Sequence, residues 1–491
     1  MNLKGKTIQG GIVTIGIQPV KFTLRIISMV ILARILIPDD FGVVGMVTAV
    51  IGVLGLFKDM GLSSASIQRS TITHEQISTL FWINLTIGGV LAVLAISIAP
   101  VLVSFYREPR LYWITIAIGG GLLFDAGSTQ HQALLLRQMR YVALAGIDIL
   151  SLMLSIAVGI AMAIFGFGYW SLVGMTLSQP ITSAVFIWVT AAWVPGRPQM
   201  NIGIRSMLHF GGTITLNNLV SYLTYNAEKI LLGRFWGTEV LGIYGRAYQL
   251  INLPTEQLNS AIGKVAFPAL SRLQDDHARF RTYFVKGYSL VLAMTIPITL
   301  ACAMFADDII YVFLGPKWNA AAAIFRYLAP TILAFALINP FGWLLMARGL
   351  VRRSLIMALV IAPLVIAAYG VGLSHGPVGV AIGYSAMMTL LVVPMIAWAK
   401  HGMPISSMDI LGAASRPILA GIVAGALAFG AQFYCGHLLS SLPRLVLVCV
   451  VLFSSYLFML MYGMGQKNFY MGLLQELKSR TSVMEQKEAA G

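Results

Sequence analysis

Polar and charged side chains recur at helical spacing inside two apolar segments of this 491-residue chain. In the first segment, the residues separated by 4, 3, 4 and 3 positions are Thr14, Gln18, Lys21, Arg25 and Ser28. In a later segment, the residues separated by 4, 3 and 4 positions are Asn218, Tyr222, Tyr225 and Lys229, with Asn226 and Glu228 beside them. This spacing places each set on one face of a helix. Because a cation deep in an apolar segment is costly and usually functional, both faces predict the lining of a polar cavity.

The chemistry of these two faces favours a phosphorylated carbohydrate. Guanidinium and ammonium groups suit phosphate, whereas Tyr, Asn and Gln supply the donors, acceptors and flat apolar surfaces that sugars need. The candidate cationic residues of the cavity are Lys21, Arg25, Lys229 and Arg246. The candidate polar and aromatic residues are Gln18, Asn218, Tyr222, Tyr225 and Asn226. We expect the cavity to hold an amphiphile with a pyrophosphate head and a glycan.

Three acidic residues are candidates for coupling transport to H⁺ or Na⁺, namely Asp59, Asp125 and Glu228. Each also has a structural interpretation. Lys58 and Asp59 could neutralise each other, Asp125 could be a satisfied packing residue, and Glu228 could pair with a neighbouring cation. Since the chain contains no nucleotide-binding motif, the energy must come from an ion gradient, a substrate gradient or a partner. We expect no cofactor and no metal site.

Apolar segments that must position these residues fill almost the whole chain, which is 58% hydrophobic and only 10% charged. A run of about 20 apolar residues spans a bilayer as a helix. The expected spans are 8–36, 41–66, 78–105, 111–135, 142–166, 169–194, 207–233, 240–263, 287–306, 319–346, 354–372, 376–398, 412–435 and 444–464. The sequence therefore predicts an all-α polytopic membrane protein with about fourteen transmembrane helices.

The distribution of Lys and Arg predicts the orientation. With the N-terminus inside, 21 of them fall on the inner side, 6 on the outer side and 6 within spans. The positive-inside rule then gives an even number of spans, with both termini in the cytoplasm. Fourteen spans fit this count, and twelve are an alternative. The net charge of +15 is therefore topological, and no basic stripe predicts binding to nucleic acid.

An internal repeat relates two parts of the chain at a constant offset of 200 residues. The aligned pairs are Arg34 with Arg234, Gly42 with Gly242, Gly45 with Gly245 and Asp39 with Glu239. A weaker match pairs EPRL at 108–111 with GPKW at 315–318. We expect a first lobe over 1–200, a second over 201–400, two added spans within 401–465 and a cytoplasmic tail over 466–491. Parallel repeats of this kind build transporters with the substrate site between the halves.

Signatures of enzymes are missing from the sequence. It contains no GxSxG, HExxH, Walker or GxGxxG motif. The acidic pairs Asp39-Asp40, Asp275-Asp276 and Asp307-Asp308 are expected to be solvated residues of short loops. The three cysteines lie in apolar stretches without metal-like spacing. We therefore expect a protein that is not an enzyme.

Several motifs resemble the polysaccharide transporter family, the lipid-linked oligosaccharide flippases of the MATE-like MOP superfamily. They are KTIQGG near the N-terminus, ILARILIPDDFGVVGMV at 31–47, GLSSASIQR at 61–69, LFWINL at 80–85, LGPKW at 314–318 and LLMARG at 344–349. They are most similar to the branch that exports colanic acid and related exopolysaccharides, and the resemblance covers nearly the whole chain.

This resemblance implies two six-helix lobes in a V around a central cavity, with two extra C-terminal helices. It also implies alternating access in the bacterial inner membrane, where an undecaprenyl-pyrophosphate-linked repeat unit crosses the bilayer for exopolysaccharide or lipopolysaccharide biosynthesis. Polysaccharide polymerase or co-polymerase machinery would be a partner. In related flippases cationic cavity residues are required, and Lys21, Arg25, Lys229 and Arg246 match that description. An ion-coupled multidrug antiporter of the MATE type and a membrane-embedded glycan polymerase or acyltransferase are the alternatives.

Overall fold

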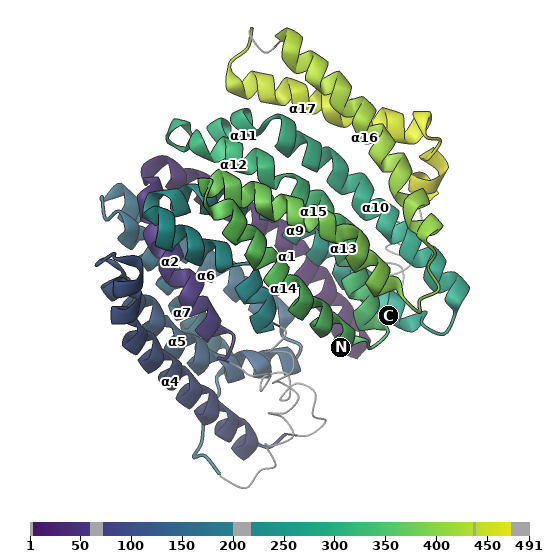
Figure 1. Cartoon of the computed structure of the whole chain (residues 1–491). Helices are drawn as coiled ribbons and strands as arrows, with labels where there is room; N and C mark the ends of the chain where they lie inside the picture. The colour runs from purple at the N-terminus through teal and green to yellow at the C-terminus, as the bar shows by residue number, and fades with distance from the viewer. Residues whose placement is uncertain (1–2, 59–71, 200–217, 436–437, 473–491) are drawn as a thin grey trace. The chain divides into compact units, whose positions relative to one another are not determined.

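Helices make up nearly all of the structure, a computed structural model that describes residues 3–58, 72–199, 218–435 and 438–472 (Figure 1). No strand occurs in these ranges. The helices before residue 200 are α1 (Leu3–Ile35), α2 (Pro38–Gly55), α4 (His74–Tyr106), α5 (Leu111–Arg137), α6 (Tyr141–Ile164) and α7 (Tyr169–Ala191). The prediction of an all-helical protein is confirmed.

A very long helix opens the second half of the chain. The elements there are α9 (Ala227–Arg272), α10 (His277–Met304), α11 (Ala306–Phe313), η1 (Pro316–Trp318), α12 (Ala320–Leu328), α13 (Pro330–Ala347), α14 (Val351–Leu373), α15 (Gly376–Lys400), α16 (Ser407–Cys435), α17 (Ser441–Phe458) and η2 (Met459–Gly463). Gly237 interrupts α9 with a φ of 83°, so that two helical segments meet at a kink. A positive φ strains residues with a Cβ, which makes glycine the suitable residue at this kink.

Local sequence signals set several helix ends. Pro38 occupies the first turn of α2, where its missing N–H leaves no hydrogen bond unmade. The Asp40 carboxylate then accepts a hydrogen bond from the Ile37 N–H at 3.2 Å. At the start of α4, Thr73 and Gln76 form a capping box, in which each side chain accepts from the backbone N–H of the other. Asp39 and Asp40 are therefore first-turn residues of a helix, which corrects the prediction that they are loop residues.

Twelve of the fourteen predicted spans match helices that are long and apolar enough to cross a membrane. The two that do not are 207–233 and 240–263. Residues 207–217 lie outside the described residues, and α9 carries the rest of both segments. Charged and amide side chains lower the hydropathy of α9, so composition alone does not mark it as a span. The chain is a multi-pass membrane protein.

Two compact units divide the described chain, one of Met1–Arg246 with Ala358–Val380 and one of Ala247–Met357 with Ala381–Gly491. In the first unit α4 packs on α5, α5 and α6 pack on α7, and α1 packs on α6. Small residues allow the closest of these contacts, because a Cβ at Gly88 would lie 2.4 Å from Ala126 and one at Gly119 would lie 2.5 Å from Ala95. Such small-residue contacts are the usual way for membrane helices to approach closely.

Ion pairs tie the last helices into the second unit. The Arg444 guanidinium of α17 donates to Asp308 of α11, whose side chain is only 3% exposed. Arg281 of α10 donates to Asp409 of α16 through Nε, at 2.7 Å. Asp308 is thus a buried structural partner, not the solvated loop residue that the sequence predicts. The proposed lobe boundaries at 200 and 400 stay a prediction.

Candidate functional site

Two ion pairs lie inside the predicted spans of the first unit. Lys21 Nζ of α1 contacts Asp148 Oδ2 of α6 at 2.7 Å, with the two side chains 20% and 45% exposed. Lys58, just after α2, contacts Asp125 of α5 at 2.9 Å, with side chains 40% and 36% exposed. Both pairs therefore join helices while keeping part of their charge accessible.

These pairs change the predicted roles of the acids. Asp125 pairs with Lys58, whereas the sequence suggested that Lys58 would pair with Asp59, which lies outside the described residues. Sequence reasoning did not include Asp148 in the site, although it lies on the helix that packs against the polar face of α1. Arg25, one turn after Lys21 on the same face, is exposed.

A break in the backbone organises the second polar face. Residues 218–224 are helical, and a turn at Tyr225 and Asn226 separates them from α9. The Asn226 amide nitrogen donates to the Tyr222 carbonyl at 2.9 Å, and its carbonyl oxygen accepts from Lys229 Nζ at 2.7 Å. An Asn can thus close the turn and hold an ammonium group with one side chain.

Glu228 lies in the first turn of α9, beside this break. It is 0% exposed, and neither carboxylate oxygen has a hydrogen-bond partner in the described part of the chain. The Tyr222 hydroxyl does not bind Glu228 but donates to the Thr48 and Ala49 carbonyls of α2 at 3.1 and 3.2 Å. Tyr222 therefore connects the helical residues 218–224 to α2.

The remaining candidates lie apart from these contacts. The Arg246 guanidinium of α9 stacks on the Phe41 ring of α2 at 4.3 Å from its centroid. Asn218 is exposed, and Gln18 is half-buried. The structure thus connects predicted residues into local groups around Lys21, around Asn226 and around Arg246. That all of them line one cavity stays a prediction.

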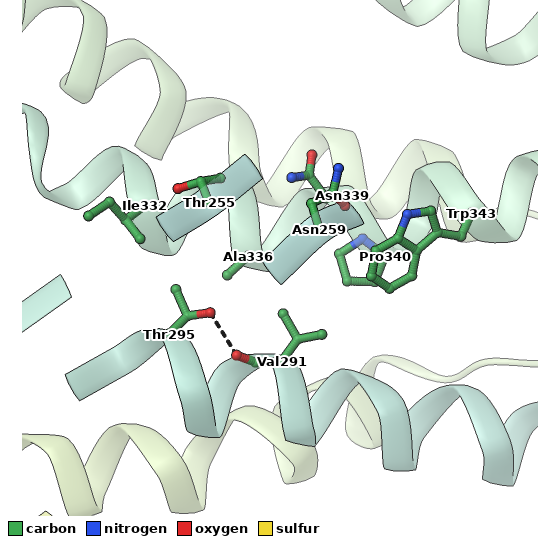
Figure 2. A pocket seen from close by; sticks show the side chains of 9 residues that line it. All are labelled: Thr255, Asn259, Val291, Thr295, Ile332, Ala336, Asn339, Pro340 and Trp343. Atoms are coloured by element: carbon green, nitrogen blue, oxygen red, sulfur yellow. Dashed lines mark hydrogen bonds between the residues drawn. The ribbon is translucent and has the colours of Figure 1, made fainter. Parts of the chain in front are cut away.

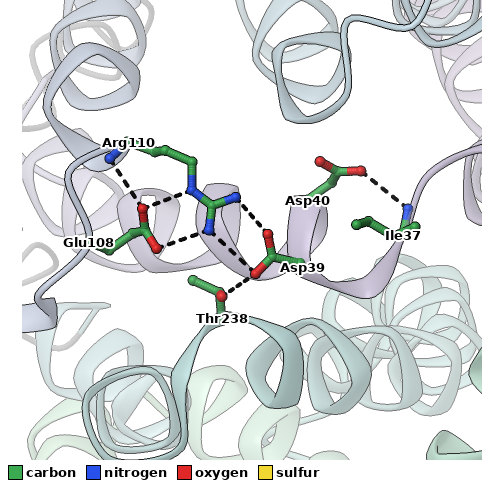
Figure 3. Close-up of polar contacts among 6 residues, drawn as sticks. All are labelled: Ile37, Asp39, Asp40, Glu108, Arg110 and Thr238. Carbon is green, nitrogen blue, oxygen red and sulfur yellow. Dashed lines mark hydrogen bonds and ion pairs between the residues drawn. The ribbon is translucent and has the colours of Figure 1, made fainter.

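A further polar cluster joins the start of α2, the N-cap residue of α5 and the kink of α9, on the side that the charge count assigns to the outside (Figure 3). The Arg110 guanidinium contacts Asp39 Oδ2 at 2.6 Å and Glu108 at 2.8 Å and 2.9 Å. The Thr238 hydroxyl of α9 donates to the same Asp39 carboxylate. This hydrogen bonding by Arg110 lowers the pKa of Glu108 below its usual value.

Backbone contact reinforces this cluster in a symmetric way. A Cβ built at Gly42 would lie 1.7 Å from the Thr238 carbonyl oxygen, and one at Gly242 would lie 1.9 Å from the Pro38 carbonyl oxygen. Gly42 and Gly242 are equivalent positions of the repeat, and so are Pro38 and Thr238. The repeats therefore touch through the same two positions on each side, as the subunits of a symmetric dimer do. We call this contact the α2–α9 crossing.

Sequence reasoning found the repeat but not this role for it. The offset of 200 residues marked Gly42, Gly242 and Asp39, and the EPRL match marked Arg110. The sequence could not show how far apart the repeats lie, because a constant offset along the chain does not say that two copies touch. Among the described residues, no group of three or more His, Cys, Asp or Glu side chains could hold a metal ion.

Comparison with known proteins places residues 31–323 in the family described as "Polysaccharide biosynthesis protein". The chain is 30% identical to the teichuronic acid biosynthesis protein TuaB of Bacillus subtilis over 59% of this chain and 61% of TuaB. It is 25% identical to the lipopolysaccharide biosynthesis protein WzxC of Escherichia coli over 78% of this chain and 79% of WzxC. It is 22% identical to the succinoglycan biosynthesis transport protein ExoT of Rhizobium meliloti over 63% of this chain and 62% of ExoT. The matches to TuaB and ExoT thus span less than two thirds of those relatives.

Solved structures identify the fold. The structure of the lipid II flippase MurJ in an inward closed conformation matches with a TM-score of 0.74 and 14% identity, over 95% of this chain and 100% of MurJ. An inward-facing multidrug resistance MATE transporter of the MOP superfamily matches with a TM-score of 0.60 and 16% identity, over 80% of this chain and 96% of that chain. The prediction of a MATE-like fold is confirmed.

Proposed function

We propose that this chain, which belongs to the polysaccharide biosynthesis protein family, is a flippase for a lipid-linked oligosaccharide. It would carry an undecaprenyl-pyrophosphate-linked repeat unit across the bacterial inner membrane by alternating access. The product would serve exopolysaccharide or lipopolysaccharide biosynthesis. The names of TuaB, WzxC and ExoT support a role in making surface polysaccharides, and that of ExoT supports transport.

One observation in the structure carries this proposal, namely the partly exposed charges of Lys21, within the first membrane span, and of Lys58, just beyond the end of α2. Charged groups in hydrocarbon are costly, so exposed ion pairs at membrane depth favour a water-filled space over lipid. A cation whose carboxylate partner is also exposed can exchange that partner for a phosphate oxygen at little cost, because both are anionic oxygen ligands. In the absence of substrate, the two ion pairs would therefore keep Lys21 and Lys58 in position for a phosphate group.

The α2–α9 crossing supports alternating access. A substrate that passes between the repeats must leave one end of the protein closed while the other end is open. Contact through Gly42 and Gly242 brings the backbones together without side chains between them. We propose that this crossing closes the outer end and that it separates when the protein opens outward.

Both termini would lie in the cytoplasm, as the bias of Lys and Arg predicts. The flipped unit would pass to polymerase or co-polymerase machinery. The protein itself would catalyse no covalent step, so the chemistry of chain growth would belong to those partners.

Substitution of cavity cations tests the function. In a strain that lacks the native gene, Lys21→Ala, Arg25→Ala or Lys229→Ala should abolish polymer export while protein levels stay normal. Lys21→Arg should restore export, because it keeps the charge beside Asp148. Arg279→Ala is a matched control, since the Arg279 side chain is 80% exposed and pairs only with Asp276, the N-cap residue of its own helix, among the described contacts.

The same strains separate flippase from its alternatives. A flippase defect leaves single lipid-linked units facing inward, whereas a polymerase defect leaves them facing outward. Wild-type export in all three alanine variants would contradict the proposal. Normal polymer together with increased drug susceptibility in the deletion strain would instead identify a multidrug antiporter.

A further inference from the structure

An open groove lies on the second unit, between the start of α10 and the connection from α15 to α16. Its volume is about 470 Å³, within the range of about 300–1,000 Å³ that is usual for sites of small ligands. The residues that line it are His277, Ala278 and Arg281 of α10, with Met403, Pro404, Ile405 and Ser406 of the connection. We call it the α10–α16 groove.

Another cavity of the same unit is too small to compete with this groove as a ligand site. It lies between α9, α10 and α13 and has a mostly apolar lining (Figure 2). Its volume is only about 20 Å³, which leaves room for a single water molecule.

The α10–α16 groove lies at the ends of membrane spans. α15 ends at Lys400 and α16 begins at Ser407, so the groove is lined by the residues that connect the two. The distribution of Lys and Arg assigns these helix ends to the cytoplasmic side. Near its start, α16 exposes two large apolar side chains, Met408 at 77% and Leu411 at 61%. A ligand in the groove therefore has a polar site and an apolar helix surface next to each other, as a lipid requires.

Positive charge gathers around the α10–α16 groove and is only partly neutralised by the described contacts. Arg281 Nε donates to Asp409 Oδ2 at 2.7 Å, so this charge is balanced. The described contacts of Arg353 and Lys400 instead go to neutral oxygens. Arg353 donates to the His401 carbonyl at 2.7 Å, and Lys400 donates to the Ser407 hydroxyl.

These two hydrogen bonds also have a structural use, because they fix the connection between α15 and α16. That use needs a donor but no charge, and Gln could supply the same N–H groups. The positive-inside rule accounts for cations on this side of the membrane, but not for their position around one groove. The charges of Arg353 and Lys400 therefore point to an anion.

We propose that the α10–α16 groove binds the headgroup of an anionic phospholipid from the cytoplasmic leaflet. Arg281, Arg353 and Lys400 supply the positive charge for its phosphate diester, because guanidinium and ammonium groups pair well with phosphate oxygens. The acyl chains lie along Met408 and Leu411. Basic pockets between membrane helices on the cytoplasmic side bind headgroups of this kind. The inference goes beyond the proposed function, since it concerns a lipid of the surrounding bilayer and not the transported molecule.

Thermal unfolding of the purified full chain in detergent tests the site. Phosphatidylglycerol, phosphatidylcholine and inorganic phosphate are added in separate series at one ionic strength. Phosphatidylglycerol alone should raise the unfolding midpoint saturably, by about 2 °C at a tenfold excess over Kd, because it binds only the folded state. An equal rise with phosphatidylcholine would overturn the proposal, since the two lipids share their acyl chains and differ in net charge. So would an equal rise with inorganic phosphate, which would identify a site for a free anion, and so would the absence of any rise.

Variants that remove charge but keep a hydrogen-bond donor locate the effect. Arg353→Gln and Lys400→Gln should each raise the phosphatidylglycerol concentration at half of the full rise about fivefold, whereas Lys400→Arg should behave like the wild type. Arg279→Gln is the matched control, because it removes one positive charge from the same surface but lies outside the groove lining, 80% exposed and paired with Asp276. An equal change in Arg279→Gln would overturn the proposal, since it would show a general attraction to surface charge. Lipid binding is measured without transport, so the result does not depend on whether the chain is a flippase.

Discussion

At the scale of single residues, several described charged side chains form ion pairs, and some guanidinium groups fork between carboxylate oxygens. Arg110 is the clearest case, because its planar guanidinium reaches Glu108 and Asp39 at the same time (Figure 3). A fork of this kind fixes direction as well as charge, which Lys could not do. Thr238 then extends the network from α5 and α2 to α9.

The pH dependence of stability should reveal the Glu108–Arg110 contact. Because the pKa of Glu108 is lowered in the folded protein, the contact stabilises the fold at pH values above the unfolded pKa. That contribution is lost as the pH falls through the lowered pKa. Glu108→Gln should therefore unfold at a lower temperature than the wild type near pH 7, by the equivalent of at most about 1 kcal/mol, as befits a partly exposed pair.

Thermal unfolding from pH 7 to pH 3.5 measures this difference, which should shrink as the pH falls. Glu239→Gln is the control, because Glu239 is exposed. A gap between wild type and Glu108→Gln that stays constant over this range would show that the contact is not ionic.

At the scale of elements, the sequence predicts which helices exist better than it predicts what holds them together. Long apolar runs such as α4 and α6 were found because a span needs only length and hydropathy. The break at Tyr225 and Asn226 could not be predicted, since it depends on a hydrogen bond between a side chain and the Tyr222 carbonyl. The sequence also could not predict Asp148 as the partner of Lys21, because the packing of α1 on α6, and not the spacing of residues along the chain, brings the two side chains together.

The glycines of the α2–α9 crossing give a prediction at this scale. Gly42→Ala and Gly242→Ala should each force the helices apart, because the added Cβ would overlap a carbonyl oxygen of the other helix. Overpacking of this kind costs about 1–3 kcal/mol. Export should fall sharply in both variants, together with the unfolding midpoint.

Two neighbouring glycines serve as controls for this crossing. A Cβ at Gly45 would meet the Leu241 side chain at 3.7 Å, and one at Gly245 would meet nothing within 4 Å. Gly45→Ala and Gly245→Ala should therefore behave like the wild type. Ala favours a helix more than Gly does, so helix propensity cannot account for a loss. Equal losses at all four positions would therefore show that close approach at Gly42 and Gly242 does not explain the result.

At the scale of the whole molecule, the proposed role of the α2–α9 crossing would place the control of access in a few residues of the repeat. The two repeat segments contact each other through equivalent positions. The two halves of this contact therefore form or separate together. Pro38, Gly42, Thr238 and Gly242 supply that contact in this chain. Alternating access requires an element with two such states, because a ligand shifts an equilibrium only if the two states bind it differently.

Cross-linking the α2–α9 crossing tests whether it must open in every transport cycle. Asp39→Cys with Thr238→Cys places two thiols where the native side chains are hydrogen-bonded, within reach of a short bis-thiosulfonate reagent, which joins two thiols through disulfides and releases sulfinate. The linked protein should stop exporting polymer, and reduction should restore export to the same molecules, which makes each sample its own control. Each single cysteine variant controls for the native thiols Cys302, Cys435 and Cys449. If the fully linked protein exports as fast as the reduced protein, the crossing is a fixed structural contact, and the outer end must open elsewhere.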